Sequence, residues 1–272
     1  MSLDVEEYVR YRIANAKVSS YPFPHLFVHP VFPPDFYAEL LAHLPPTSVL
    51  TQIGEYGTVG TVNPTTGEVI GTAVADDERR YIADLATLEE DEELNGRGDL
   101  WRRTADWIMS DAFRNLVVQK FAEGIHQRFG EHAKLITDSD SRFVRDFTEY
   151  LIRPHTDKPS KLVSLLFYLP RDESMRHLGT SIYRPLDPEM RCDGTTRHPF
   201  KKFKKVATME FLPNSVFGFL RTDQSFHGVE QIHEEAVERN VLLYNVYLRK
   251  IVKRAASRSA WRWPWREQAA SR

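Results

Sequence analysis

The chain has 272 residues, of which 42% are hydrophobic and 27% charged, and its formal net charge is −2. These values indicate a folded protein with a sizeable core, and they exclude wholesale disorder and a general electrostatic attraction to nucleic acid or anionic membranes. One cysteine beside ten histidines excludes an internal disulfide, a cysteine-rich zinc site and an iron–sulfur cluster. Any metal is therefore expected to use histidine and carboxylate ligands.

The first part of the chain has helical periodicity. Residues 4–16 place apolar side chains at helical spacing, and so does the stretch from Pro33 to Leu44, which Pro45-Pro46 ends. Between them, residues 21–28 combine aromatic side chains with two prolines, which predicts an edge strand.

The next three segments differ in composition. Residues 51–75 are rich in glycine and threonine and predict a loop or an irregular hairpin. Residues 76–93 hold nine acids against two arginines, which is typical of a solvated face. Residues 101–129 keep an apolar stripe that predicts one long helix facing the core.

After about residue 135 the periodicity becomes that of short strands. The polar and basic segment 171–205 predicts an inserted loop between strands. Helices followed by strands favour a mainly β protein with flanking helices (α+β), a jelly roll buttressed by the N-terminal helices. We expect a single domain over 1–252, with a helical or irregular part at 1–134 and the core at about 135–252. The predicted strands are Phe147–Ile152, Val163–Leu169, Val206–Leu212, Val216–Phe219 and Val241–Leu248.

The chain ends in a basic, tryptophan-rich tail. Residues 253–272 hold six basic residues, one acid and three tryptophans. Such a tail can dock on its own protein, contact a second copy in a homo-oligomer or stay disordered, and the alternative is an external partner such as nucleic acid or a membrane surface. The net charge argues against nucleic acid. A signal peptide and a membrane span are not indicated, so the expected location is the cytoplasm.

One constellation of residues points to chemistry. His155 and Asp157 lie two residues apart, so on a strand they project to the same face and can bind one metal ion. His227 follows 70 residues later, and Arg239 opens the last strand. Two histidines and one carboxylate are the ligand set of non-haem iron(II) oxygenases, and a nearby arginine can bind a carboxylate with two hydrogen bonds.

Two other interpretations compete with this one. His233-Glu234-Glu235 has the same spacing, but no histidine follows it, and its charged neighbours predict a surface turn. Alternatively, His155 and His227 are hydrogen-bonded histidines of the core.

Six ordered segments resemble a known family, the iron(II)- and 2-oxoglutarate-dependent dioxygenases, close to the prolyl-4-hydroxylase-like branch with its bacterial members. The resemblance covers roughly residues 140–250. The segments are His155-Thr156-Asp157, Leu165–Pro170, Leu178–Tyr183, Pro213–Phe219, Ser225–Val229 and Arg239.

The resemblance implies a double-stranded β-helix core, a cupin-like jelly roll, in which His155, Asp157 and His227 bind iron(II). It implies that Arg239 pairs with the distal carboxylate of 2-oxoglutarate and that Tyr168 donates a hydrogen bond to the same carboxylate. The activity it implies is hydroxylation of an unactivated C–H bond, with 2-oxoglutarate and O2 converted to succinate and CO2.

The substrate is less well defined. Many members carry a serine or threonine two residues after the arginine, but here that position is Val241, so the second contact to the carboxylate of 2-oxoglutarate must come from elsewhere.

Arg153 shares the predicted face of His155 and is a candidate for binding an anionic substrate, with a salt bridge inside the barrel as the alternative. Segments 51–75 and 171–205 are candidate lids that favour a small molecule. The alternatives are hydroxylation of a protein or peptide side chain and a non-catalytic metal-binding jelly roll.

Overall fold

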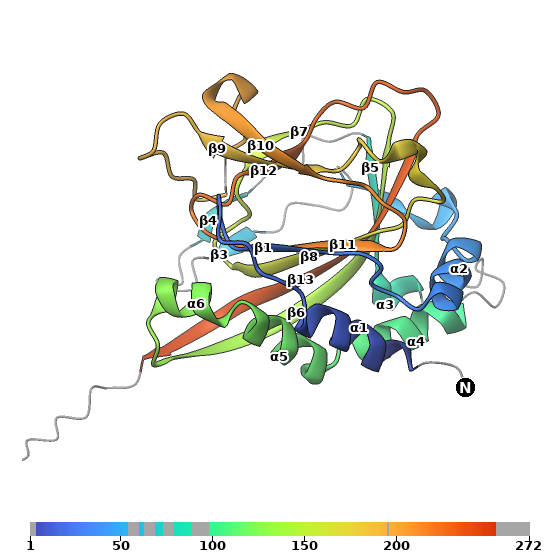
Figure 1. The fold of residues 1–272 in the computed structure, drawn as a ribbon, viewed down its shortest axis with the longest axis horizontal. Coiled ribbons are helices and arrows are strands. Elements are labelled where there is room, and N and C mark those ends of the chain that lie inside the picture. The colour runs from blue at the N-terminus through green and yellow to red at the C-terminus, as the bar shows by residue number, and fades with distance from the viewer. Residues whose placement is uncertain are drawn as a thin grey trace, which may run out of the picture.

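The computed structural model describes residues 4–53, 60–62, 69–72, 79–88, 98–194 and 196–253. Its strands form a seven-stranded sheet, a four-stranded sheet that faces it and a separate two-stranded hairpin, and helices cover the outer side of the larger sheet (Figure 1). The strands are β1 (His25–Val28), β2 (Thr51–Gln52), β3 (Gly60–Val62), β4 (Val69–Thr72), β5 (Arg80–Asp84), β6 (Ala133–Phe147), β7 (Ile152–His155), β8 (Lys161–Tyr168), β9 (Thr180–Pro185), β10 (Phe203–Met209), β11 (Ser215–Leu220), β12 (His227–Val229) and β13 (Glu238–Lys253).

The two main sheets have the alternating strand order of a jelly roll. The larger sheet runs β1-β11-β8-β13-β6-β5-β2 and the smaller one β10-β9-β12-β7, with antiparallel pairing throughout. From β6 to β13 the chain passes repeatedly from one sheet to the other, and among these strands only β9 and β10 are consecutive neighbours within one sheet. Phe217, Phe219 and Tyr168 fill the space between the sheets, and these features confirm the predicted mainly β jelly-roll core with flanking helices.

A second apolar layer joins the larger sheet to the helices, with Trp101, Phe113 and Tyr244 among its buried side chains. The predicted helices at 4–16 and after Pro33 are confirmed. The prediction of one long helix over 101–129 is wrong. Ser110 accepts a hydrogen bond from the Phe113 amide and starts a new helix there, so the apolar stripe continues across three short helices. The helices are α1 (Val5–Ala14), α2 (Pro34–Ala42), α3 (Leu85–Leu88), α4 (Gly98–Ile108), α5 (Asp111–Lys120) and α6 (Ala122–Phe129).

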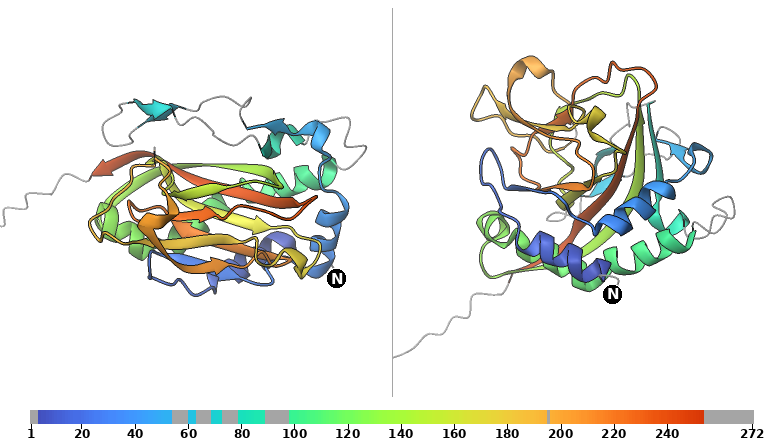
Figure 2. Two further views of the ribbon diagram at one scale, coloured as in Figure 1. Left: turned by 90° about the horizontal axis from the view of Figure 1, so that it is seen from above. Right: turned by 45° about the vertical axis from the view of Figure 1, so that its right-hand side comes forward.

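The irregular N-terminal segments are partly described. The edge strand predicted for residues 21–28 is confirmed as β1, at one edge of the larger sheet. The hairpin predicted within 51–75 is confirmed as β3 and β4, which lie to one side of the main sheets (Figure 2, left). Segment 76–93 is not simply a solvated face, because β5 pairs with β6 and buries part of its side chains. Residues 54–59, 63–68, 73–78 and 89–93 of these two segments lie outside the described residues.

Two predictions in the β-rich part are wrong. Phe147–Ile152 is a turn between β6 and β7, in which Glu149 has a φ of 69° and the Tyr150 amide donates to the Phe147 carbonyl. Segment 171–205 is not one inserted loop, because β9 lies within it and pairs with both β10 and β12. The other four predicted strands are confirmed as β8, β10, β11 and β13.

No helix in the described part of the chain has the length and apolar character needed to cross a membrane. Residues 254–272, which make up almost all of the basic tail, lie outside the described residues.

Candidate metal centre

The structure brings the three predicted metal ligands together at one end of the smaller sheet. β7 and β12 pair so that His155 and His227 lie directly opposite each other, with ring centroids 4.5 Å apart. β7 ends at His155, so Asp157 lies just beyond the strand rather than on it. Ligand atoms of the three side chains lie within 4.8 Å of one another.

Both imidazoles are oriented by the backbone two residues upstream. His155 Nδ1 lies 2.9 Å from the Arg153 carbonyl, and His227 Nδ1 lies 2.9 Å from the Ser225 carbonyl. A carbonyl oxygen only accepts, so each Nδ1 carries the hydrogen and each Nε2 keeps a lone pair for a metal. The competing interpretation is that both histidines only form hydrogen bonds in the core. That interpretation explains the contact of each Nδ1 atom, but it does not explain why both rings converge on Asp157.

The protonation states suit metal binding. Burial lowers the pKa of His155 to about 3, assisted by the neighbouring His227, and burial also lowers the pKa of His227. Burial alone raises the pKa of Asp157, but Lys161 and the two histidines outweigh it and hold that pKa below its usual range. Two neutral imidazoles and an ionised carboxylate are thus ready at neutral pH, and such ligands release few protons when a metal binds.

Further residues hold the Asp157 carboxylate. Lys161 Nζ lies 3.2 Å from Oδ1, and the Ser164 hydroxyl donates to Oδ2 at 2.9 Å. The same hydroxyl lies 3.1 Å from Asn245 Oδ1, and the Asn245 amide donates to Asp140 at 2.8 Å. A hydroxyl has a single hydrogen, so Ser164 donates either to Asp157 or to Asn245 at any one time and not to both. Lys161 and Ser164 both lie on β8 and connect the carboxylate to the larger sheet.

The segment after β9 braces the ligand strand from behind. The Cys192 carbonyl accepts hydrogen bonds from the Thr156 hydroxyl at 3.0 Å and from Arg221 Nη2 at 3.2 Å, and Arg221 Nε donates to the Asp157 carbonyl at 3.0 Å. Gly194 lies so close that a Cβ there would sit 2.4 Å from the same Asp157 carbonyl. The part of 171–205 after β9 thus supports the metal centre, a role that composition alone did not reveal.

Arg239 lies in the wall of the cavity that contains the triad. This cavity has a volume of about 90 Å³, and Thr180 also lines it. Arg239 is buried and donates to the Leu178 carbonyl, to Asp146 and, at 3.4 Å, to the Thr180 hydroxyl. The Tyr168 hydroxyl donates to Thr180 Oγ1 at 2.9 Å, so Tyr168 reaches the cavity wall through Thr180.

Arg80 is a cavity residue that sequence reasoning missed. It comes from β5, lines the same cavity as Arg239 and pairs with Asp146. In the sequence, Arg80 is one of two adjacent arginines within an acidic segment, and nothing in that pattern indicates a functional residue. Only the register of β5 against β6 shows that Arg80 lies in the cavity wall.

The predicted substrate residue Arg153 is exposed on β7, and its carbonyl is the one that orients His155. Arg197 is also near, because its positive charge contributes to the lowered pKa of His155. The competing segment at His233 and Glu234 is exposed and leads into a turn, which confirms the predicted surface turn. Glu234 contacts His177 at the surface.

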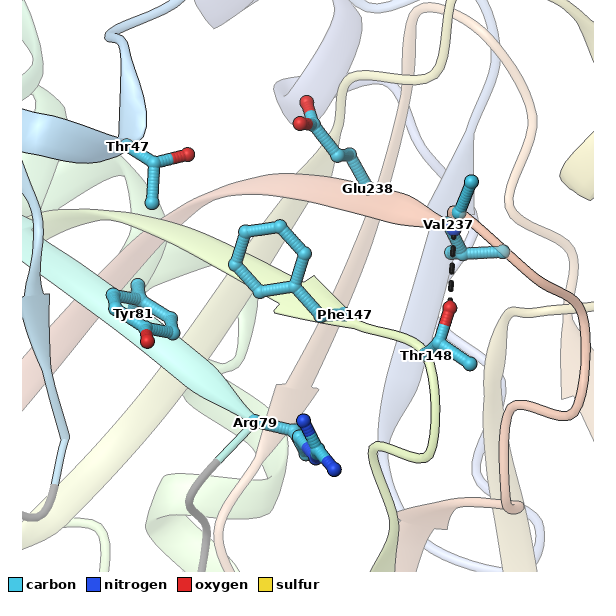
Figure 3. Close-up of a pocket in the computed structure, with 8 residues that line it drawn as sticks. Thr47, Arg79, Tyr81, Phe147, Thr148, Val237 and Glu238 are labelled. Atoms are coloured by element: carbon cyan, nitrogen blue, oxygen red, sulfur yellow. Dashed lines mark hydrogen bonds between the residues drawn. The ribbon is translucent and has the colours of Figure 1, made fainter.

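A second cavity of about 410 Å³ lies where β6 ends and β13 begins, and Phe147 and Glu238 line it. Phe147 and Tyr81 pack edge to face at its centre, and Arg79 and Glu238 border it (Figure 3). Strand alternation places Arg79 and Tyr81 on the face of β5 opposite to Arg80, so this cavity is separate from the candidate metal centre.

The sequence matches no family model and no curated protein. Among solved structures, a Pseudomonas putida prolyl-4-hydroxylase is 15% identical with a TM-score of 0.44, over 89% of this chain and 98% of that chain. AviO1 from Streptomyces viridochromogenes Tue57 is 12% identical with a TM-score of 0.43, over 91% and 96%. HygX from Streptomyces hygroscopicus, solved with nickel and 2-oxoglutarate bound, is 13% identical with a TM-score of 0.38, over 82% of each chain.

Proposed function

We propose that this protein is an iron(II)- and 2-oxoglutarate-dependent oxygenase that hydroxylates an unactivated C–H bond of a small molecule. The observation that carries the proposal is the convergence of His155, Asp157 and His227 within 4.8 Å at the wall of a cavity that also holds Arg239. Two neutral imidazoles and one ionised carboxylate on one side of a metal leave its other positions open, which suits iron(II) with a chelating co-substrate.

Each group in the cavity has a role in this proposal. The triad holds the metal, and Arg239 binds the distal carboxylate of 2-oxoglutarate while Tyr168 positions Thr180 beside it. When bound, iron(II), 2-oxoglutarate and O2 supply the oxidising chemistry, in which the co-substrate becomes succinate and CO2 and one oxygen atom enters the substrate. Apolar side chains in the cavity wall keep water away from the metal: Leu166, Phe219 and Leu243.

The substrate side of the proposal rests on charge. Arg153 is exposed next to His155, and the positive charge of Arg197 reaches the same imidazole. The exposed arginine on the strand of His155 and the positive charge of Arg197 favour a substrate with an anionic group.

The test is anaerobic addition of iron(II) and 2-oxoglutarate to the full-length protein, followed by succinate measurement under air. We expect the visible absorption band of the iron-bound 2-oxo acid and slow succinate release that the correct small molecule accelerates. His155→Ala and Asp157→Ala remove both signals, whereas His233→Ala, at the exposed competing segment, retains them. Metal binding without any succinate supports the non-catalytic module instead, and acceleration by peptides alone supports a protein hydroxylase.

A further inference from the structure

A buried carboxylate shared by two arginines lies beside the candidate metal centre. Asp146 sits on β6 between its cross-strand neighbours Arg80 on β5 and Arg239 on β13. Arg80 donates from Nε to Oδ1 at 2.6 Å and from Nη2 to Oδ2 at 3.0 Å, and Arg239 Nη1 lies 2.7 Å from Oδ2. The register of three adjacent strands therefore aligns the two guanidiniums in one row.

Both arginines line the cavity of the triad, whereas Asp146 is fully buried behind it. Arg239 has five N–H donors, and its hydrogen bonds to Leu178, Asp146 and Thr180 use three of them. The Tyr168 hydroxyl is a fourth partner, so one donor of Arg239 remains for a ligand in the cavity. Arg80 is the more accessible of the two, with 20% of its side chain exposed.

Aromatic rings hold both guanidiniums in place. Arg80 Cζ lies 4.5 Å from the centroid of the Tyr150 ring, and Arg239 Cζ lies 4.9 Å from that of Phe211. A guanidinium fixed by a carboxylate and an aromatic face loses little freedom on binding an anion.

Residue 241 cannot supply a second contact to the distal carboxylate of 2-oxoglutarate, so another residue of the cavity wall must supply it. Val241, two residues after Arg239, is buried among apolar side chains and has no hydroxyl to offer. We infer that Arg80, held by Asp146, is a second cationic contact for the distal carboxylate of 2-oxoglutarate in this cavity. This inference rests on the proposed function, and it makes β5, a strand outside the region of family resemblance, part of the co-substrate site.

An alternative is that Arg80 only fastens β5 to β6. Binding measurements on the full-length protein loaded with nickel(II), a redox-inert substitute for iron(II), separate the two. The titrants are 2-oxoglutarate and 2-oxovalerate, which has the same carbon chain without the distal carboxylate.

We expect Arg80→Met to weaken 2-oxoglutarate binding by about 10- to 100-fold, since a hydrogen-bonded charge pair is lost, and to leave 2-oxovalerate and nickel(II) binding unchanged. Arg79→Met is the matched control, because Arg79 is the adjacent arginine, faces the second cavity (Figure 3) and pairs with Glu149. It should bind both acids like the unsubstituted protein.

If Arg80→Met does not fold, the same titrations are made with Arg80→Lys, which keeps the positive charge but loses the planar guanidinium group. A several-fold loss for 2-oxoglutarate alone supports the inference. Unchanged 2-oxoglutarate binding in the folded Arg80 variants, or an equal loss for both acids, overturns it. Failure of the unsubstituted nickel protein to bind 2-oxoglutarate instead overturns the proposed function.

Discussion

Gly228→Ala is predicted to separate the two strands that carry the histidines. Gly228 follows His227 on β12, and a Cβ at this position would lie 2.5 Å from the Ile152 carbonyl oxygen on β7. Ordinary contacts begin at 3.4 Å, so the strands must part by about 0.9 Å. Metal–ligand distances tolerate changes of about 0.2 Å, and the displacement is several times larger.

The expected result is a loss of nickel(II) affinity of at least about 10-fold, measured by isothermal titration calorimetry on protein that still unfolds cooperatively. The overpacking itself should cost about 1–3 kcal/mol of unfolding free energy.

Gly218→Ala on β11 is the matched control. Its Cβ would also lie 2.5 Å from its nearest neighbour, but that neighbour is the Leu165 Cδ2 atom at the end of a side chain. Rotation of Leu165 relieves the overlap, so nickel binding should not change. Unchanged nickel affinity in folded Gly228→Ala, or an equal loss in Gly218→Ala, would refute the reasoning.

The remaining predictions concern residues that support the fold and the centre. Ser164→Ala removes the hydroxyl that donates to Asp157 at 2.9 Å, and nickel affinity should fall about 10-fold with little change in thermal midpoint; unchanged affinity contradicts the role given to this hydrogen bond. Arg221→Met removes the donor to the Asp157 carbonyl and one of the two donors to the Cys192 carbonyl, and it should cost about 1–3 kcal/mol in urea unfolding. A loss below about 0.5 kcal/mol would show that these hydrogen bonds contribute little. Asn214 has a φ of 57° and accepts hydrogen bonds from two backbone amides after β1. Asn214→Ala should therefore destabilise more than Asn214→Gly, and the reverse order would argue against strain at this position.

The convergence of His155, Asp157 and His227 could be predicted because its signal is largely local. His155 and Asp157 are two residues apart, and the strand-forming residues around His227 and Arg239 indicate a sheet that can bring distant segments together. Order along the chain then favours the pair His155 and Asp157 over His233 and Glu235, because no histidine follows the second pair.

The errors have a different origin. Phe147–Ile152 has the composition of a strand, but the positive φ of Glu149 turns the chain there, so tertiary structure overrides local preference. Arg80 and Asp146 are 66 residues apart, and their pairing depends on the register of β5 against β6, which no local pattern encodes. The break at Ser110 was missed because the apolar stripe continues past the cap.

The two carbonyls that orient the imidazoles have an evolutionary consequence. Main-chain atoms of residues 153 and 225 select the tautomer of each histidine, so the tautomer does not depend directly on the side chains at those positions. The buried Ser225 hydroxyl is itself held by the Thr222 backbone, whereas the Arg153 side chain is exposed and can vary. The carbonyl of Arg153 is thus engaged with His155 while the side chain points to solvent. Substitutions at position 153 can therefore change the charge beside the candidate metal centre without changing which nitrogen of His155 is available to a metal.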